Sequence, residues 1–541
     1  MQGLMMDVPL MISSLIRHAD RYHGDAEIVS RTVEGPLHRY TYRDAHSRSR
    51  RLARALSRLG VASGDRVGTL AWNGYRHFEL YYAISGMGAV THTINPRLFH
   101  DQLAYIIDHA DDRIVFFDLT FTALVEQLAA VCKGVKRWVA MTDRDHMPQA
   151  TIPGLLCYEE LVSAESDDFE WPEFDENTAA ALCYTSGTTG NPKGVLFSHR
   201  STILHAYAIS LPDTKGLSAS SSVLAIVPMF HVNAWGIPYA APMVGCKLVF
   251  PGPALDGASL YKLLESEAVD STSAVPTVWM NLINYMQQNK LKFSTLRHTT
   301  IGGAACPPAM IKTLGEFGVR VMHGWGMTEM SPVGTLNAPK GKHTGLSADA
   351  KFQLSLKQGR PLYGVEMKIV DVEGRELPRD GKSSGNLLVR GPWILRRYYK
   401  DSGGDPLTPD GWLPTGDVGT IDADGYLQIT DRSKDVIKSG GEWISSIELE
   451  NIAVGHPAVI EAAVIGVSHP KWDERPLLIV VKRQGSDLTK EDLLEFYNGK
   501  IAKWWLPDDV VFVDELPHTA TGKLSKLTLR ERFRDYRLPT C

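Results

Sequence analysis

The most informative stretch of the sequence is Tyr184-Thr185-Ser186-Gly187-Thr188-Thr189-Gly190-Asn191-Pro192-Lys193-Gly194. Four hydroxyl side chains and three glycines lie close together in it. Such a segment supplies side-chain donors and unobstructed backbone N–H groups, which suit the oxygens of a polyphosphate. Apolar residues 179–183 and 195–197 flank it closely, which argues against a flexible Ser/Gly linker.

A P-loop nucleoside triphosphatase is the obvious competing interpretation of this segment. Its loop requires the pattern GxxxxGK[ST]. Here Lys193 follows Pro192 and precedes Gly194, so the register of that pattern is not met. The segment therefore predicts a phosphate-binding loop of another kind.

Composition excludes several classes of protein. The chain has 541 residues, and domains of about 150 residues would give three or four of them. Lys and Arg number 57 against 62 Asp and Glu, the net charge is -5, and 44% of residues are apolar. These values argue against a disordered chain and against a strongly basic nucleic-acid binder.

The six cysteines form no CxxC pair, so neither a zinc ribbon nor a thioredoxin-type redox pair is indicated. A reducing compartment, and hence a cytoplasmic location, is the simplest expectation. Asp7 and Pro9 interrupt the first residues, and no basic segment precedes their apolar neighbours, which argues against a secretory signal.

Short β-branched apolar runs alternate with helical patterns as far as about residue 340, which is typical of βα units with parallel strands. Between Gly359 and Tyr426 short strands separated by turn dipeptides such as Asp424-Gly425 predict antiparallel β structure. After Asp431 helix and strand patterns mix again, over the length of a small domain. The predicted helices are 47–59, 78–87, 447–455 and 490–500, and the predicted strands include 66–71, 89–94, 299–301, 459–467, 477–481 and 510–513.

The helix predicted at 47–59 carries Arg48, Arg51, Arg54 and Arg58 away from its apolar face. A nucleic-acid patch is one interpretation, but the negative net charge favours a solvated amphipathic helix.

Residues 223–246 contain no Asp, Glu, Lys or Arg and are long enough to suggest a membrane span. Three prolines, His231 and Asn233 would interrupt the backbone ladder in lipid, so a buried core segment is the favoured interpretation.

Five further motifs follow the phosphate loop in an ordered series. They are Trp325-Gly326-Met327-Thr328-Glu329, Thr415-Gly416-Asp417, Asp431-Arg432-Ser433-Lys434-Asp435, Lys438-Ser439-Gly440-Gly441-Glu442 and Pro517-His518-Thr519-Ala520-Thr521-Gly522-Lys523. The loop and this series resemble the adenylate-forming superfamily, which contains acyl-CoA synthetases, peptide-synthetase adenylation domains and luciferase. The resemblance covers essentially the whole chain. It implies a large N-terminal lobe with parallel sheets and a distorted β-barrel, and a small, mobile α+β C-terminal domain.

The resemblance implies a role for each motif in condensing a carboxylate with ATP. Lys523 would supply a mobile ammonium to the substrate carboxylate and the α-phosphate, and Thr328 would donate to that phosphate. Glu329, with Thr185 as a further oxygen donor, would hold Mg²⁺, an ion that prefers hard oxygen ligands. Asp417 would accept from the ribose hydroxyls, with Arg432 beside it. The implied cofactor-binding set is completed by Ser186, Gly187, Thr188, Thr189, Gly190, Lys193, Gly302, Gly303, Ala304, Trp325, Gly326 and Met327.

The resemblance also points to an acid pocket and a hinge. His231 matches the aromatic position that lines or gates the carboxylate pocket, although a lone His in an apolar run is more often a core residue. Trp235, four residues on, would lie on the same side if the segment is helical, and would form a pocket wall with Gly302. Lys434 matches the pivot, giving domains at 1–431 and 435–541 with a hinge at 432–434. After rotation, Lys438, Gly440, Gly441, Glu442 and Trp443 would approach the CoA arm.

The sequence therefore predicts an acid–CoA ligase that uses ATP, Mg²⁺ and CoA and forms an acyl-adenylate. The sequence as a whole most resembles short- to medium-chain fatty acyl-CoA ligases and bacterial ligases acting on 3-methylthiopropionate in dimethylsulfoniopropionate degradation. Alternatives are a medium-chain or aromatic acyl-CoA ligase and, in a different class, a non-catalytic nucleotide-binding module. A peptide-synthetase module would be followed by a carrier domain, so a free-standing ligase is expected. Dimers are common in such ligases, which implies a homodimer without nucleic-acid or membrane partners.

Overall fold

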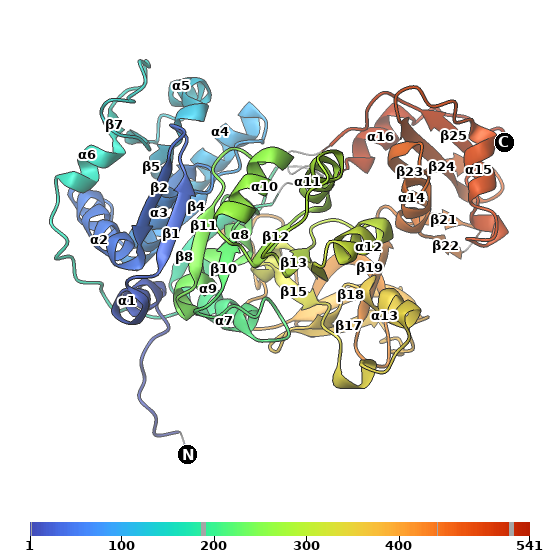
Figure 1. Ribbon diagram of the computed structural model, residues 1–541, viewed down its shortest axis with the longest axis horizontal. Coiled ribbons are helices and arrows are strands. Elements are labelled where there is room, and N and C mark those ends of the chain that lie inside the picture. The colour runs from blue at the N-terminus through green and yellow to red at the C-terminus, as the bar shows by residue number, and fades with distance from the viewer. Residues whose placement is uncertain (2, 186–190, 441, 519–523, 541) are drawn as a thin grey trace.

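The computed structural model describes residues 1, 3–185, 191–440, 442–518 and 524–540. It shows a large body formed by most of the chain, from the N-terminus onwards, and a smaller body formed by the C-terminal part (Figure 1). Two large mixed sheets and one antiparallel sheet build the large body, and a five-stranded sheet builds the small one. The predicted fold class is thus confirmed.

The first large sheet has seven strands. Its spatial order is β7 (Leu155–Cys157), β6 (Arg137–Ala140), β5 (Asp112–Phe117), β3 (Arg66–Leu70), β4 (Val90–Thr93), β8 (Ala179–Tyr184) and β9 (Gly194–Ser198). All neighbouring pairs are parallel except β8 and β9. Helices cover both faces, so its central strands are buried and read as apolar runs, as parallel strands do.

The second large sheet has nine strands. Its order is β16 (Arg360–Pro361), β15 (Val333–Leu336), β14 (Arg320–Gly326), β13 (His298–Ile301), β12 (Ser271–Ala274), β10 (Ser222–Leu224), β11 (Lys247–Phe250), β1 (Glu27–Arg31) and β2 (Leu37–Thr41). Its strands are parallel from β14 to β1 and antiparallel at both ends. Side chains from both large sheets and the helices between them form one apolar core.

The helices of the large body lie against these sheets (Figure 1). They are α1 (Ile12–His23), α2 (Tyr42–Arg58), α3 (Tyr75–Gly86), α4 (His100–Ala110), α5 (Thr122–Val131), α6 (Tyr158–Ser163), α7 (His199–Ser210), α8 (Val232–Trp235), α9 (Ile237–Val244), α10 (Gly257–Ser266), α11 (Pro276–Gln288), α12 (Pro308–Glu316) and α13 (Ala348–Ser355). None in the described ranges is long and apolar enough to cross a membrane. The segment 223–246 is instead β10, α8 and α9 inside the protein core, as expected.

Helix α2 illustrates how local sequence sets an element. Thr41 caps it, because its hydroxyl accepts the Asp44 N–H at 3.3 Å while the Asp44 carboxylate accepts the Thr41 N–H at 2.9 Å. Arg54 pairs with Asp168 at 2.6 Å and Arg58 with Glu165 at 3.1 Å. Three of the four arginines of the predicted patch, Arg48, Arg54 and Arg58, thus have carboxylate partners, in agreement with the amphipathic-helix interpretation rather than a nucleic-acid patch.

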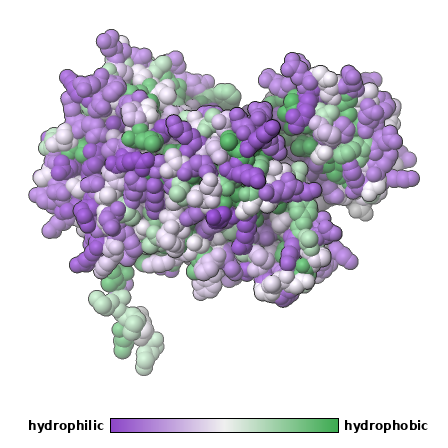
Figure 2. Space-filling model, in the orientation of Figure 1, coloured by the Kyte–Doolittle hydropathy of each residue, from purple (hydrophilic) through white to green (hydrophobic). Residues whose placement is uncertain are grey.

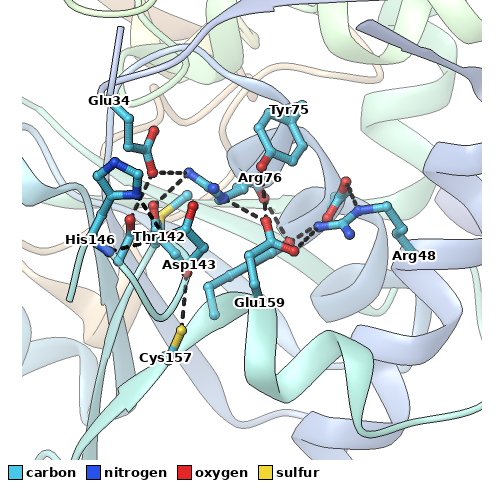
Figure 3. A network of polar contacts seen from close by, with 12 residues as sticks. Glu34, Arg48, Tyr75, Arg76, Thr142, Asp143, His146, Cys157 and Glu159 are labelled. Carbon is cyan, nitrogen blue, oxygen red and sulfur yellow. Dashed lines mark hydrogen bonds and ion pairs between the residues drawn. The ribbon is translucent and has the colours of Figure 1, made fainter. Parts of the chain in front are cut away.

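Arg48 of α2 joins a larger polar network that ties α2, α3, α6 and the loop after β1 together (Figure 3). Glu159 lies in its middle, 2.9 Å from Arg48 Nη2 and 2.8 Å from Arg76 Nε. Arg76 also reaches Glu34 at 2.8 Å. Because most of these charges are buried and paired, the network fixes how the helices pack on the seven-stranded sheet.

The antiparallel part is a four-stranded sheet of β17 (Glu366–Val370), β18 (Ser384–Arg390), β19 (Leu413–Ile421) and β20 (Leu427–Arg432). A bridge between Gly359 and Leu427 connects its edge strand to the start of β16. This sheet therefore continues the antiparallel end of the nine-stranded sheet, where the sequence predicts a distorted barrel.

The small body contains β21 (Ile437–Ser439), β22 (Glu442–Ile444), β23 (Val459–His469), β24 (Asp473–Lys482) and β25 (Asp509–Phe512), with α14 (Ser446–Val454), α15 (Lys490–Phe496) and α16 (Lys526–Arg532). Two apolar clusters, one with α14 and α15 and the other with α16, contain only residues after position 436. Helix α15 is shorter than predicted because the chain turns at residues 497–500, where Gly499 has a φ of 74°.

Candidate active site

The predicted phosphate loop lies between β8 and β9, whose strands contain the apolar residues that flank it in the sequence. At its neck the Thr185 N–H donates to the Lys193 carbonyl at 2.9 Å, and the Lys193 N–H donates to the Thr185 hydroxyl at 3.2 Å. These bonds continue the antiparallel pairing of Tyr184 with Gly194. The predicted residues Ser186, Gly187, Thr188, Thr189 and Gly190 lie outside the described residues.

The motif after β14 and the motif on β19 meet in space. Trp325 Nε1 donates to Asp417 Oδ2 at 2.7 Å, and Arg432 Nε lies 3.4 Å from Asp417 Oδ1. Asp417 and Arg432 are register partners on the neighbouring strands β19 and β20. This pairing brings the two side chains together although they are fifteen positions apart in the sequence. Asp417 is buried, so its carboxylate is held at a fixed place and angle.

Gly326 is the last residue of β14 and pairs with Val333 of β15, and Met327 follows it. A Cβ at Gly326 would lie 1.9 Å from the Pro332 carbonyl oxygen, so only glycine fits there. The Met327 N–H donates to the same carbonyl at 3.2 Å. This close approach turns the chain into the short helix η2 (Thr328–Met330), which begins at the predicted Thr328 and buries Glu329.

Glu329 is positioned by a residue that the sequence analysis does not single out. The Tyr398 hydroxyl donates to Glu329 Oε1 at 2.8 Å, and the Leu395 N–H donates to the Glu329 carbonyl at 2.7 Å. Lys193 Nζ lies 4.9 Å from the centre of the Tyr398 ring, within cation–π range. Tyr398 therefore links the phosphate-loop lysine to the carboxylate predicted to hold Mg²⁺.

A groove of about 450 Å³ opens beside this group. Glu329 and Tyr398 line it, together with β9 residues and the segment 392–401. Arg396, Arg397 and Lys400 line its wall together with Asp401. Arg397 pairs with Asp401 at 3.4 Å and Lys400 with Asp111 at 2.6 Å, so much of this positive charge is balanced. The groove has the size to accept the end of a polyphosphate.

On the acid side, Gly302 and Gly303 follow β13 and lie against Trp235. A Cβ at Gly302 would meet the Gly324 carbonyl oxygen at 2.9 Å and Trp235 Cη2 at 3.5 Å. Gly303 has a φ of 79°, and a Cβ there would lie 3.6 Å from Trp235 Cζ2. The predicted neighbour Ala304 is exposed next to them. These positions keep a gap between backbone and indole that a side chain would fill.

The helical interpretation of the segment after His231 is wrong. Residues 232–235 all have φ between 45° and 53°, and Gly236 follows at 80°, so α8 is a left-handed turn. The four-residue spacing of His231 and Trp235 therefore does not place them on one helix face. Tertiary packing imposes this conformation, since Val232, Ala234 and Trp235 are all buried in the core shared by the two large sheets.

His231 itself is the residue before this turn, and its N–H donates to the Pro228 carbonyl at 2.9 Å. The preceding residues are pinned, because the Met229 N–H donates to Asn73 Oδ1 at 2.6 Å and the Met229 carbonyl accepts the Tyr81 hydroxyl at 2.6 Å. The His231 ring is half-buried.

The remaining predicted residues belong to the hinge and the small body. The chain leaves β20 after Arg432. Burial lowers the pKa of Lys434, the predicted pivot, which follows two residues later. Lys438 and Trp443 are register partners in the β21–β22 hairpin, and the Gly440 N–H donates to the Trp472 carbonyl at 2.8 Å within the same body. Gly441 and Lys523 lie outside the described residues, and only the backbone of Glu442 is described.

Comparison with known proteins identifies the family of this chain. Residues 15–399 match the AMP-binding enzyme family, and residues 448–523 match the AMP-binding enzyme C-terminal domain. The chain belongs to the AMP-binding enzyme family. Its predicted membership of the adenylate-forming superfamily is thereby confirmed.

Two curated relatives of this AMP-binding enzyme are similar along its whole length. A 3-methylmercaptopropionyl-CoA ligase of Ruegeria lacuscaerulensis is 55% identical, over 99% of each chain. A medium-chain-fatty-acid–CoA ligase of Ectopseudomonas oleovorans is 51% identical, over 99% of this chain and 98% of the relative. Among solved structures, the anthranilate CoA ligase AuaEII in complex with anthranoyl-AMP superposes with a TM-score of 0.86 at 25% identity, over 98% of both chains. The predictions of an enzyme and of an acyl-CoA ligase are confirmed by these relatives.

Proposed function

We propose that this AMP-binding enzyme joins short- to medium-chain carboxylic acids, with 3-methylthiopropionate among the preferred ones, to CoA through an acyl-adenylate. The observation that carries the proposal is that one segment, Trp325–Glu329, serves two groups at once. Its Trp325 holds Asp417, and its Glu329 lines the groove beside Tyr398. The two ends of this segment would thus grip the ribose and the phosphates of ATP.

In the first step the acid carboxylate attacks the α-phosphate of ATP, the bond to the β-phosphate breaks, and pyrophosphate leaves. An acid with an ordinary pKa near ~4 is already ionised at pH 7, so no general base is needed. Asp417 accepts from the ribose hydroxyls, while Lys193 and Thr328 donate to phosphate oxygens. Lys523 offsets the repulsion between the two anions.

Mg²⁺ would be held by Glu329, with Thr185 as a further oxygen donor, and would neutralise phosphate charge. The residues fit this ion, because a buried carboxylate faces the groove and is oriented by the Tyr398 hydroxyl. A protein needs to offer Mg²⁺ only one or two carboxylates, since phosphate oxygens and water complete its shell.

In the second step the CoA thiol attacks the carbonyl carbon of the mixed anhydride, and AMP leaves. We place the mobile domain at 435–541, turning on Lys434 at the hinge 432–434 against the domain 1–431. The small body has its own apolar core, which suits rigid rotation. Rotation would withdraw Lys523 and bring Lys438, Gly440, Gly441, Glu442 and Trp443 towards the CoA arm.

His231 would close the carboxylate end of the acid pocket, and Trp235 with Gly302 would form its wall. A homodimer and a cytoplasmic location complete the proposal, and light scattering of the purified enzyme tests the former. A medium-chain or aromatic acid is the alternative substrate, since the relatives' names span several acids.

Two experiments test the proposal. A panel of C2 to C12 acids plus 3-methylthiopropionate and benzoate, scored by kcat/KM for CoA-dependent AMP formation, should peak on the short thioether acid and its alkyl neighbours. A maximum at C10 or above, or on benzoate, would overturn the acid assignment. Absence of acid-dependent pyrophosphate release would favour a non-catalytic nucleotide-binding module.

The second experiment separates the half-reactions. Lys523→Ala should lose adenylate formation while still converting preformed acyl-AMP and CoA to thioester. The exposed Lys262→Met on α10 serves as the control and should leave both half-reactions unchanged. Equal loss of both in Lys523→Ala would sink the role given to this lysine.

A further inference from the structure

Lys215 is a buried lysine that none of the predicted motifs contains. It is 2% exposed, and its Nζ donates to the Ser273 hydroxyl at 2.6 Å. Its backbone is fixed on both sides, because its N–H donates to the Ile209 carbonyl at 3.0 Å and its carbonyl lies 3.2 Å from His298 Nε2. The side chain therefore points to one place in the core rather than sampling several.

This ammonium lies beside the wall proposed for the acid pocket. Lys215 Nζ is 5.7 Å from the centre of the Trp235 ring. Two atoms of the same indole lie near the glycines, because a Cβ at Gly302 would be 3.5 Å from Cη2 and a Cβ at Gly303 would be 3.6 Å from Cζ2. Trp235 is thus in contact both with the glycines at the pocket mouth and with Lys215.

The strands under Trp235 add two hydroxyls to the same place. Ser273 on β12 and Thr300 on β13 are register partners in adjacent parallel strands, which also lie side by side in Figure 1, so both point to one face of the sheet. Thr300 is 2% exposed, and its Oγ1 has no hydrogen-bond partner within the described ranges. Thr300 precedes Gly302 by two residues, which ties this hydroxyl to the pocket mouth.

The group has unused hydrogen-bonding capacity. An ammonium has three donors, and Lys215 spends one of them on Ser273 within the part of the chain that the structure describes. In those residues no carboxylate pairs with Lys215, although burying a cation without a counter-charge is costly. Aromatic contact with Trp235 offsets part of that cost. An acceptor from outside the chain would satisfy both the ammonium and the Thr300 hydroxyl.

We propose that Lys215, Ser273 and Thr300 form a hydrogen-bonding floor of the acid pocket, which selects short acids carrying a hydrogen-bond acceptor at the end remote from the reacting carboxylate. This inference rests on the acid–CoA ligase activity proposed above and specifies its substrate class. The acceptor is a hydroxyl, an ether oxygen, a thioether sulfur or a second carboxylate. A purely alkyl tail of the same length would cover the floor but leave its hydrogen-bond donors without an acceptor. Leaving buried polar groups of the pocket unpaired is the strongest basis on which a pocket rejects an analogue.

The protonation of Lys215 gives the floor a pH signature. Burial lowers the pKa of Lys215 to about 7, so the ammonium is lost as the pH rises through neutrality. The titratable groups around it are His205 on α7, whose pKa burial lowers to about 3, and His298 on β13, whose pKa burial also lowers. Asp270 and Arg320 act on His298 in turn. His205 stays neutral from pH 6 to 8.5, so the preference for acceptor-bearing acids should weaken over that range chiefly through Lys215.

Matched acids of five, six and seven chain atoms test the floor. At each length the alkyl acid is compared with its ω-hydroxy, ether, thioether and dicarboxylate analogues, using kcat/KM for CoA-dependent AMP formation at pH 6, 7 and 8.5. The wild-type enzyme should favour at least one acceptor-bearing analogue over the alkyl acid by ~10-fold or more at pH 6. Comparing neutral analogues with the dicarboxylate shows which acceptor the floor takes.

Lys215→Met keeps the length and burial of the side chain and removes its donors. The ratio of kcat/KM for acceptor-bearing over alkyl acids should fall at least ~10-fold and lose its pH dependence, because the acceptor-bearing acids lose more than the alkyl acid. Ser273→Ala should shift the same ratio in the same direction, and it remains informative if Lys215→Met does not fold. The exposed Lys262→Met should behave as wild type.

An unchanged preference in both Lys215→Met and Ser273→Ala would overturn the inference, because active enzyme would then be choosing acids without the floor. Equal loss on alkyl and acceptor-bearing acids would also overturn it, since that result marks a structural role. Failure of wild-type enzyme to form AMP from any acid is a different outcome, and it would overturn the proposed function as well.

Discussion

The hydroxyl of Tyr398 offers the sharpest test of how the phosphate end of the site is built. It donates to Glu329 Oε1 at 2.8 Å, and Glu329 is 8% exposed. Burial, together with the neighbouring Glu329, raises the pKa of the Tyr398 phenol far above its ordinary value, so the hydroxyl stays a donor at every working pH. Tyr398→Phe removes this donor and keeps the ring against Lys193.

The expected size of the effect follows from the kind of bond that is lost. A hydrogen bond to a charged group contributes about 1.5–3 kcal/mol, which corresponds to a factor of roughly 10–150. Loss of a residue that orients a metal ligand commonly costs about 10–100-fold in metal affinity or activity. We therefore expect Tyr398→Phe to lower kcat/KM for ATP by about 10–100-fold, with half-saturation shifted to higher Mg²⁺ concentration.

The assay is acid-dependent pyrophosphate release measured against Mg²⁺ at fixed ATP. Tyr399→Phe is the matched control, because the Tyr399 hydroxyl has no hydrogen bond within the described residues while its ring packs against His109. The control should retain the wild-type Mg²⁺ curve. An unchanged Mg²⁺ curve in Tyr398→Phe would refute the reasoning, because Glu329 would then not depend on Tyr398 or would not hold the ion.

Three further changes probe other parts of the molecule. Asp417→Asn removes the charge beside Arg432 and should raise the KM for ATP by about 10-fold or more while the KM for the acid stays the same; equal rises in both would contradict a ribose-binding role. Lys434→Pro fixes φ at the pivot and should slow thioester formation from acyl-AMP without slowing adenylate formation, as followed by separate half-reaction assays. Burial raises the pKa of Asp118, which accepts the Trp72 N–H, to about 7, so its contribution to stability is full below its unfolded pKa near 3.8 and is lost as the pH rises through 7. Asp118→Asn should therefore gain stability relative to wild type between pH 5 and pH 8, by about 3 kcal/mol in denaturant titrations, and a pH-independent difference would contradict it.

The parts of the site that the sequence predicts well are those that local spacing determines. The phosphate loop is one, because its hydroxyls and glycines stand together in the sequence between apolar segments, and the structure closes its neck with two hydrogen bonds. Gly326 belongs to a predicted motif, but the close approach of the Pro332 carbonyl oxygen that requires a glycine there is seen only in the structure. The motif order along the chain is enough to predict the fold class.

Contacts between distant segments could not be predicted in this way. Tyr398 reaches Glu329 across 69 positions, and Lys215 reaches Ser273 across 58. Neither residue has a periodic or motif signal, and a lone lysine is ordinarily expected at the surface. The helical prediction for residues 232–235 was wrong for a related reason. Tertiary packing there overrides the preference of non-glycine residues for right-handed backbone conformations.

The position of the proposed hinge would constrain how one chain carries out the two proposed reaction steps. Asp431, at the end of the four-stranded sheet, accepts the Ser446 N–H at 2.6 Å and the Ser446 hydroxyl at 2.7 Å, so the small body is bonded to the large one close to the proposed pivot. Asp417, Trp325 and Glu329 are instead held by contacts within the large body. Rotation at Lys434 would break the hydrogen bonds between Asp431 and Ser446 and leave the contacts within the large body intact. The nucleotide would then stay in place on the large body, while rotation of the small body replaces Lys523 with the glycine hairpin. This arrangement requires that the residues binding ATP and the residues that move between the two steps belong to different sheets.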